Sequence, residues 1–381
     1  MSASPPGSRG WVRADPMSLP LFPRRLQLTL ATKRRASDRT LIVTLRLGAG
    51  HAFAYRPGQF VGLEAVDGRP RYFSIANAQP VDDEIELHIN RVPGGAFTGA
   101  LFDTARVGDS FWMTGPFGDF ALAPAAASSL ILVAGGTGFA PIKACLQQLA
   151  SLSQEDRGPR RAIHLYWGAR TSADLYDIDG IAHLAERLPG LRFVPVVDQG
   201  TVDGSTRPGP VHQAVVADFA NLSDHDIYAC GAPGMIDALS KTCAAERGFD
   251  PARLVADVFI AGATDTDASR PAGSPVDVAL DTRDGRQAVA GTAGEALLFA
   301  LKRAGVPMQS VCGGKGACGT CRVRIAPEWR DRLPPPAKRE TRLLQFIGAE
   351  EGDRLSCQIL LAANLGGLEL QTSLDNLGES Q

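Results

Sequence analysis

Short runs of alternating apolar and polar residues occupy the chain from Leu26 to Pro116. Five such runs lie at 26–34, 41–47, 59–66, 84–92 and 109–116, and Gly, Pro and Asp turns separate them. Alternation with a period of two is typical of strands that bury one face, and short strands joined by turns favour an antiparallel barrel. The pattern therefore predicts a barrel domain over residues 26–125.

The pattern changes at Ser129, where continuous apolar runs begin to alternate with helix-like segments. The apolar runs lie at 130–136, 162–169, 191–197 and 226–231, and the helix-like segments at 141–152, 181–188, 211–219 and 235–248. Strands that are apolar on both faces are typical of parallel sheets covered by helices. Residues 126–262 are therefore predicted to form a doubly wound parallel α/β domain.

The start of the chain and the stretch after Phe259 differ in composition from both domains. Residues 1–25 are rich in Pro, Ser, Gly and Arg and are predicted to be a disordered leader. Residues 263–275 have the composition of a linker. A strand at 276–282 and a helix at 295–305 then open a third domain, predicted over 276–375.

Overall composition narrows the class of protein. The chain has 381 residues, 44% of them hydrophobic and 21% charged, which suits several globular domains. It has no apolar run of membrane-spanning length and no signal-peptide pattern, so we expect a cytoplasmic protein without a membrane span. A formal net charge of −2 argues against a general nucleic-acid binder.

Four of the seven cysteines gather near the end of the chain. Cys312, Cys318 and Cys321 lie in one glycine-rich stretch, and Cys357 follows 36 residues after Cys321. Four thiolates are the ligand set of a [2Fe–2S] cluster, and the glycines let the loop wrap closely around it. A structural zinc site is the alternative, but it usually has two CxxC pairs, and only Cys318 and Cys321 form one here. A disulfide framework is less favoured without a secretory context.

Two stretches of the barrel region favour a phosphate-bearing ligand. Arg71 and Ser74 lie three residues apart on an extended segment, where an Arg fork and a hydroxyl can address one ligand. Gly94, Gly95 and Thr98 precede an expected helix whose N-terminus suits a pyrophosphate. Each signal alone is weak, because Gly-Gly is usually a turn and a strand Arg is usually at the surface.

The α/β region contains a glycine turn between its first strand and helix. Gly135, Gly136 and Gly138 permit a tight turn, and the helix N-terminus near Pro141 suits an anionic group. The turn lacks the GxGxxG pattern of dinucleotide-binding dehydrogenases, so a generic phosphate loop remains the alternative for this stretch alone. Arg170 and the segment from Cys230 to Met235 follow later strands, at the edge of the sheet where such folds bind ligands.

Together these motifs resemble two known families. RYFS, GGAFT and GPFGDF, followed by GGTGFAP, YWGAR and CGAPGM, resemble the ferredoxin–NADP reductase superfamily of oxygenase-reductase type. The last hundred residues resemble a plant-type [2Fe–2S] ferredoxin domain with a β-grasp fold, although the first cysteine gap holds five residues where that pattern has four. The family usually has Tyr where this chain has Phe73, so one hydroxyl to the flavin is missing and Tyr72 is its possible substitute.

The resemblance implies cofactors and roles for individual residues. It implies FAD rather than FMN, a [2Fe–2S] cluster, and a nicotinamide donor, for which we favour NADH over NADPH because no Arg or Ser cluster suits a 2′-phosphate. Ser74, Cys230 and Phe259 are the residues expected at the site of hydride transfer. The residues expected to bind cofactors are Arg71, Tyr72, Phe73, Ser74, His88, Gly94, Gly95, Thr98, Gly135, Gly136, Thr137, Gly138, Pro141, Arg170, Cys230, Gly231 and Met235.

The implied activity is electron transfer from NADH through a flavin and the cluster to a partner oxygenase. A Rieske-type aromatic hydroxylase or demethylase, or another two-component monooxygenase, is the expected acceptor. The alternatives are a haem monooxygenase, an enzyme of deoxysugar synthesis, and a flavin and cluster redox sensor without turnover. We expect the reductase alone to be a monomer.

Overall fold

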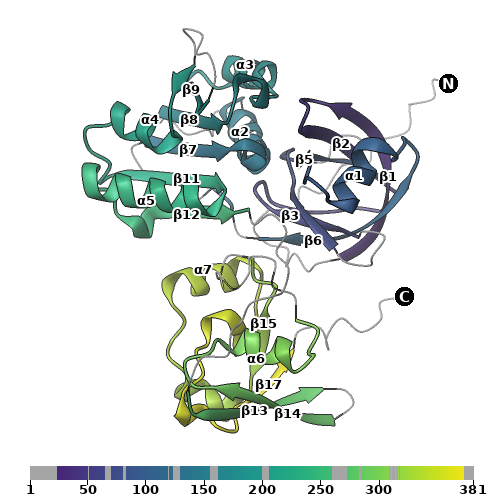
Figure 1. Ribbon diagram of the computed structural model, residues 1–381, viewed down its shortest axis with the longest axis vertical. Helices are drawn as coiled ribbons and strands as arrows, with labels where there is room; N and C mark the ends of the chain where they lie inside the picture. Colours follow the sequence, from purple (N-terminus) through teal and green to yellow (C-terminus); the bar gives the residue numbers. More distant parts are fainter. Residues whose placement is uncertain are drawn as a thin grey trace, which may run out of the picture.

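Three sheets, each in its own part of the chain, make up the protein in the computed structural model (Figure 1). The structure describes residues 24–49, 51–64, 70–79, 83–118, 120–122, 129–154, 162–199, 206–259, 273–282, 285–308, 310, 314, 316 and 318–372. The predicted leader, apart from its last two residues, and most of the predicted linker lie outside these residues. So does Cys312.

The first sheet is a nearly closed antiparallel barrel. Its strands are β1 (Arg24–Arg35), β2 (Thr40–Leu47), β3 (Phe60–Glu64), β4 (Pro70–Ser74), β5 (Glu84–Asn90) and β6 (Ser110–Phe117), in the order β4-β3-β6-β1-β2-β5. A bridge between Ile75 and Leu87 brings the two edges of the sheet together just beyond β4. Alternate residues fill the barrel interior, as the sequence pattern predicts, and α1 (Ala96–Asp103) packs against it.

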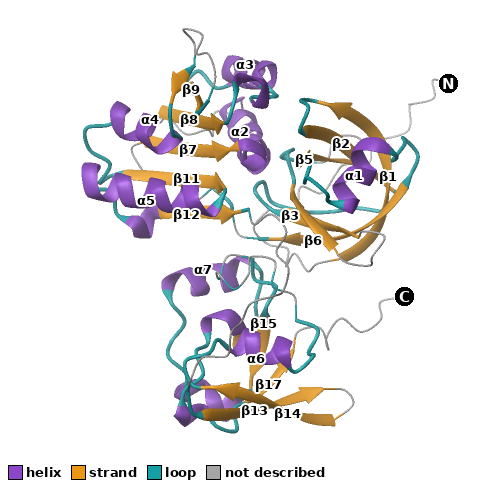
Figure 2. Ribbon diagram, in the orientation of Figure 1, coloured by secondary structure: helices purple, strands orange, loops and turns teal. Residues whose placement is uncertain are grey.

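The second sheet is parallel and has helices on both faces. Its strands are β7 (Ser129–Gly135), β8 (Ala162–Ala169), β9 (Leu191–Val197), β10 (Arg207–Pro208), β11 (His225–Gly231) and β12 (Leu254–Val258), in the order β10-β9-β8-β7-β11-β12. Helices α2 (Phe139–Gln154) and α3 (Ile178–Arg187) cover one face. Helices α4 (Val211–Asp218) and α5 (Pro233–Arg247) cover the other (Figure 2).

The third sheet is mixed and belongs to the cysteine-rich domain. Its strands are β13 (Pro275–Thr282), β14 (Gly285–Thr292), β15 (Arg322–Ile325), β16 (Asp353–Leu355) and β17 (Glu369–Thr372), in the order β14-β13-β17-β15-β16. β13 and β17 are parallel, and the other neighbours are antiparallel. Helices α6 (Leu297–Arg303) and α7 (Lys338–Phe346) pack against its core.

The predicted fold class is confirmed in all three parts: an antiparallel barrel, a parallel α/β domain and a C-terminal ferredoxin domain. The sequence analysis did not predict β14–β17, β12 or α7. Strands of three to five residues such as β16 and β17 are too short to show a period of two. The domain boundaries stay a prediction; the first strand of the barrel starts at Arg24, and β13 starts at Pro275, inside the predicted linker.

Candidate functional site: three cofactor seats

Strand β4 carries the predicted flavin residues at one edge of the barrel sheet. Side chains alternate along a strand, so Arg71 and Phe73 share one face, and Tyr72 and Ser74 share the other. Phe73 stacks on Phe97 of α1 with ring centroids 5.9 Å apart, while Ser74 is buried with 5% of its surface exposed. Because β4 is an edge strand, a ligand lying along this edge can contact side chains of both faces.

The predicted pyrophosphate turn precedes α1. Gly94 has φ 71°, and Gly95 is the N-cap of α1 without a side-chain cap. The hydroxyl of Thr98 accepts a hydrogen bond from the backbone N–H of Val92 at 3.1 Å, so Thr98 closes the turn from within. The first-turn N–H groups of α1 therefore have no side-chain acceptor at the N-cap and suit an anionic ligand.

His88 on β5 lies between the barrel and the α/β domain. Its ring is fully buried, with Nδ1 2.8 Å from the hydroxyl of Tyr176 and Nε2 2.8 Å from Oε1 of Glu86. Both ring nitrogen atoms thus have protein partners. Its predicted role as a cofactor-binding residue stays a prediction, and its hydrogen bond with Tyr176 joins the barrel to the α/β domain.

Lys143 of α2 completes this polar network. Its Nζ lies 2.9 Å from Oε1 of Glu86 and 2.9 Å from Oδ2 of Asp177. Burial alone would raise the pKa of Glu86, but the hydrogen bond with His88 and the charge of Lys143 outweigh burial and lower that pKa to about 2. Burial lowers the pKa of His88 and favours its neutral ring.

The glycine turn of the α/β domain packs directly on the end of β11. A Cβ atom on Gly138 would lie 2.1 Å from the backbone oxygen of Cys230, so only glycine permits this approach. A Cβ atom on Gly135 would lie 2.6 Å from Sδ of Met235. The two predicted motifs, GGTG and CGAPGM, are therefore parts of one site.

Aromatic side chains lie next to this glycine turn and fix its position. Trp167 of β8 donates a hydrogen bond from Nε1 to the backbone oxygen of Gly136 at 2.9 Å. Its ring stacks on Phe139 at the start of α2, with centroids 4.1 Å apart. Cys230 is fully buried, and burial raises the pKa of its thiol, so the thiol stays protonated. Phe259, just after β12, donates its backbone N–H to Gly231 at 2.8 Å.

A pocket of about 510 Å³ opens at the carboxyl edge of the parallel sheet. The predicted residues Gly136, Thr137, Arg170 and Met235 line it. Other lining residues come from both domains. Gly168 and Ala169 belong to the predicted YWGAR motif, and Ala232 and Gly234 belong to the predicted segment from Cys230 to Met235. The remaining lining residues were not predicted: Arg39, Thr40, Asn90, Asp174, Asp198, Gly209, Pro210, Val211, His212 and Ala238. Asp198 directly follows an apolar strand, and that position is the signal by which it could have been found.

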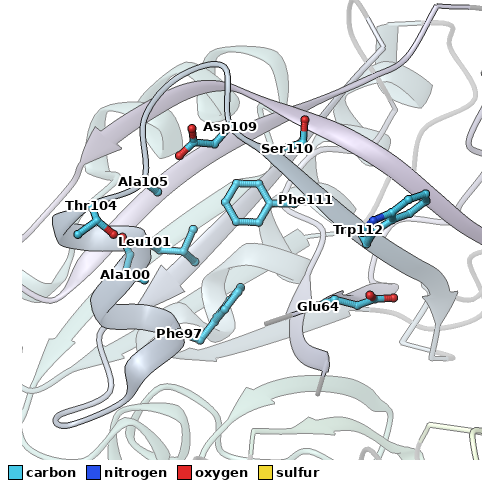
Figure 3. A pocket seen from close by; sticks show the side chains of 10 residues that line it. All are labelled: Glu64, Phe97, Ala100, Leu101, Thr104, Ala105, Asp109, Ser110, Phe111 and Trp112. Atoms are coloured by element: carbon cyan, nitrogen blue, oxygen red, sulfur yellow. Dashed lines mark hydrogen bonds between the residues drawn. The ribbon is translucent and has the colours of Figure 1, made fainter. Parts of the chain in front are cut away.

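A second hollow of about 510 Å³ lies on the barrel between α1 and β6. Phe97, Leu101, Phe111 and Trp112 line it together with polar residues such as Glu64 (Figure 3). None of the residues predicted for the site lines this hollow.

Three of the four predicted cluster ligands lie in the described part of the third domain. Cys318, Cys321 and Cys357 are 3%, 1% and 7% exposed, and Cys312 lies outside the described residues. Ser356 donates its backbone N–H and its hydroxyl to the backbone oxygen of Cys321, which holds Cys321 beside Cys357. The hydrogen bond between these two thiols, followed by burial, raises the pKa of Cys321.

This donor set fits a [2Fe–2S] cluster. Buried, crowded thiols ionise only beside a cation, and an iron cluster supplies that charge. Among the described residues no three His, Cys, Asp or Glu side chains converge on a point where one metal ion would bind. A cluster needs no such point, because each of its two irons takes only two protein thiolates.

Comparisons with known proteins agree with these three seats. Residues 27–122 match the oxidoreductase FAD-binding domain, residues 132–241 the oxidoreductase NAD-binding domain, and residues 281–362 the 2Fe-2S iron-sulfur cluster binding domain. Reductase component 2 of terephthalate 1,2-dioxygenase from Comamonas sp. is 34% identical over 242 residues, which cover 63% of this chain and 70% of the relative. An aromatic O-demethylase reductase subunit from Amycolatopsis is 37% identical over 218 residues, which cover 56% of this chain and 63% of the relative.

Solved structures show the same architecture. An Amycolatopsis cytochrome P450 reductase matches with a TM-score of 0.57 and 36% identity, over 62% of this chain and 70% of that one. An intact type IV self-sufficient cytochrome P450 monooxygenase shares the fold over 91% of this chain and 41% of its own, with a TM-score of 0.64 and 20% identity. The chain belongs to the family of oxygenase reductases with FAD-binding, NAD-binding and [2Fe–2S] domains. It is an NAD(P)H-dependent flavin and iron–sulfur oxidoreductase.

Proposed function

We propose that the protein takes electrons from NADH and passes them through FAD and its [2Fe–2S] cluster to a partner oxygenase. The observation that carries this proposal is that the barrel contacts both the α/β domain and the ferredoxin domain. Arg39 and Asn90 of the barrel line the pocket of the α/β domain, and Cys318 of the ferredoxin domain packs on barrel residues Phe60 and Phe117. A flavin held by the barrel is thus next to both a nucleotide pocket and a cluster ligand.

Each seat has a distinct task in this proposal. The bound flavin supplies the change from two-electron to one-electron transfer. Arg71, Ser74 and the first turn of α1 would hold and orient the flavin, and the glycine turn would hold the nicotinamide nucleotide. Orientation is the main requirement, because hydride transfer between stacked rings needs no acid or base from the protein.

Two carboxylates of the nucleotide pocket, Asp174 and Asp198, support NADH as the donor. The cations Arg39 and Arg170 line the same pocket, and Thr171 donates its hydroxyl to Asp174 at 3.1 Å. A 2′-phosphate would add about two negative charges next to these carboxylates. Like charges at close range disfavour NADPH more than NADH.

The relatives support the proposed electron acceptor, and the free cysteines support the proposed location. Terephthalate and naphthalene dioxygenase reductases and an aromatic O-demethylase reductase are among them, which supports a ring-hydroxylating or demethylating oxygenase as partner. A CDP-6-deoxy-L-threo-D-glycero-4-hexulose-3-dehydrase reductase from Yersinia pestis is 33% identical over 221 residues, so deoxysugar synthesis is the second candidate. Buried free thiols at Cys145, Cys230 and Cys243 suit the reducing cytoplasm.

No helix among the described residues is long and apolar enough to cross a membrane. We propose that the reductase alone works as a monomer. Gel filtration with light scattering of the purified protein tests that part of the proposal.

Anaerobic titration with NADH tests the function. We expect the flavin absorbance and the broad cluster absorbance to bleach in turn, and we expect cytochrome c to be reduced rapidly in steady state. A colourless, zinc-containing protein would contradict the proposal, and so would a protein that NADH and NADPH leave unchanged. Reconstitution with a dioxygenase, a cytochrome P450 and a deoxysugar dehydrase then separates the candidate acceptors.

A further inference from the structure

Aromatic rings of the barrel form one hydrophobic cluster with Cys318 of the ferredoxin domain. Phe60 of β3, Tyr72 of β4 and Phe117 of β6 form a triangle with ring centroids 5.7 to 6.0 Å apart. Cys318 belongs to the same buried cluster and is 3% exposed. These three rings are called the aromatic seat below.

Glycines of the barrel make room for the aromatic seat. A Cβ atom on Gly62 would lie 3.0 Å from Cε1 of Tyr72, and one on Gly118 would lie 2.8 Å from Cε1 of Phe60. Gly118 also has φ 92°, a backbone conformation that residues other than glycine rarely adopt. The backbone around the seat is therefore shaped for the rings.

The aromatic seat lies on the barrel face that carries Ser74, whose hydroxyl is predicted to bind the flavin. Phe60 is directly opposite Ser74 in the β3–β4 ladder, and directly opposite residues of antiparallel strands point to the same face. The next pair, Val61 and Phe73, belongs to the barrel interior. Cys318 thus meets the barrel on the face of Ser74 and away from its core.

We propose that the aromatic seat docks the loop that begins at Cys318 (residues 318–321) of the ferredoxin domain and positions the cluster at the edge of the flavin site. Phe60, Tyr72 and Phe117 act as positioning residues for the internal electron transfer. In that transfer one electron leaves the reduced flavin and converts one Fe(III) of the cluster to Fe(II), and no bond forms or breaks. This inference rests on the proposed function.

Substitutions of the seat test the positioning role in the holoenzyme. In Phe60→Leu and Phe117→Leu the apolar character remains and the ring is lost. We expect NADH to bleach the flavin within about twofold of the wild-type rate, and cluster reduction to slow at least about tenfold in anaerobic stopped flow, because misplacement by about 1 Å can cost 100-fold in rate. Phe117→Tyr keeps the ring and should restore the rate.

The matched control is Trp112→Leu on the same strand as Phe117. Trp112 is 40% exposed and is covered by Arg25, whose guanidinium carbon lies 4.0 Å from the ring centre. Since Trp112 is outside the seat, its loss should leave the rates of flavin and cluster reduction unchanged. A slowing in this control equal to that in Phe117→Leu would overturn the assignment.

Hydrogen–deuterium exchange gives a readout that is independent of activity. Peptides covering residues 318–325 should take up deuterium faster in the two Leu variants than in the wild type, Phe117→Tyr and Trp112→Leu. Unchanged exchange, or faster exchange with an unchanged rate of cluster reduction, contradicts the inference. If NADH fails to bleach the wild-type flavin, the proposed function fails, and the exchange experiment still decides whether the seat docks the loop.

Discussion

Lys143 Nζ lies 2.9 Å from Glu86 Oε1 and so links α2 of the nucleotide domain to β5 of the flavin barrel. The same ammonium lies 2.9 Å from Asp177, and Glu86 also bonds His88, whose other nitrogen meets Tyr176. The Tyr176 ring in turn packs edge-on against Trp167, which holds the glycine turn through Gly136. A chain of contacts thus runs from the barrel to the nucleotide loop.

Lys143→Met should destabilise the protein by about 2 to 3 kcal/mol, because it leaves two partly buried carboxylates, Glu86 and Asp177, without their shared cation. The Lys143 side chain is 13% exposed, so solvent cannot replace the lost charge. Urea denaturation measures the effect. The control is Lys241→Met, whose exposed partner is Asp237 and whose cost should stay below about 0.5 kcal/mol. Equal costs for the two variants would show that the network adds no stability.

Stability should fall on acidification from about pH 6.5 downward. The pKa values of His88 and Glu86 are both lowered in the folded protein, so the unfolded chain binds more protons as the pH falls through 6.5 and then 4.5. Lys143 acts in the opposite direction, because its raised pKa favours the folded state until the pH rises past 10.5. Urea midpoints across this range check the sign. In Glu86→Gln the loss below pH 4.5 should be smaller than in the wild type.

Gly138→Ala should abolish binding of the nicotinamide nucleotide or unfold the α/β domain locally. The new Cβ atom would lie 2.1 Å from the backbone oxygen of Cys230, which no side-chain rotation relieves. Calorimetric titration with NAD⁺ measures the loss, and circular dichroism monitors folding. Gly99→Ala in α1 is the control, because nothing lies within 4 Å of its new methyl group. Tight nucleotide binding by Gly138→Ala would show that the nucleotide binds at another part of the protein.

Asp198→Asn should raise kcat/KM for NADPH relative to NADH. Removal of one carboxylate from the pocket reduces repulsion of a 2′-phosphate, and about 1 kcal/mol, or about fivefold, is the upper end for a change of one exposed charge such as Asp198. Steady-state assays with ferricyanide and both nucleotides measure the ratio. Asp237→Asn on the exposed face of α5 serves as the control. An unchanged ratio would exclude Asp198 as the residue that selects the nucleotide.

Cys357→Ser should remove the cluster and so separate flavin reduction by NADH from electron transfer through the cluster. We expect flavin reduction by NADH and ferricyanide reduction to remain, and cytochrome c reduction to fall at least about tenfold. Iron analysis and visible spectra follow the loss. Cys243→Ser, a buried thiol of α5, should keep the full iron content. Retention of iron and cytochrome c reduction in Cys357→Ser would exclude Cys357 as a cluster ligand.

Local patterns predicted the parts of the fold that depend on local order. The continuous apolar run of β7 and the alternation along β1 and β2 led directly to the parallel sheet and the barrel. Helix α7 was missed because it has nine residues, most of them polar, after three prolines. Among the described residues its buried face packs against β16 and lies next to Gly319, which are far from it in the sequence.

The motifs of the site were predicted one by one, but the contacts between the motifs were not predicted. The glycines of GGTG and the backbone of Cys230 are about a hundred residues apart, and only the parallel pairing of β7 with β11 brings them together. His88 was expected at a cofactor because of the family resemblance, but its hydrogen-bond partner Tyr176 comes from another domain. The contact of Cys318 with Phe60 depends on domain packing, which residue patterns do not encode locally.

Electron paramagnetic resonance of the holoenzyme, frozen within seconds of anaerobic mixing with NADH, tests the central claim most directly. If electrons pass from NADH through the flavin to the cluster, the spectrum of a reduced [2Fe–2S] cluster should appear as the flavin absorbance bleaches. Bleaching of the flavin without any cluster signal, in a protein shown to contain iron, would contradict the account.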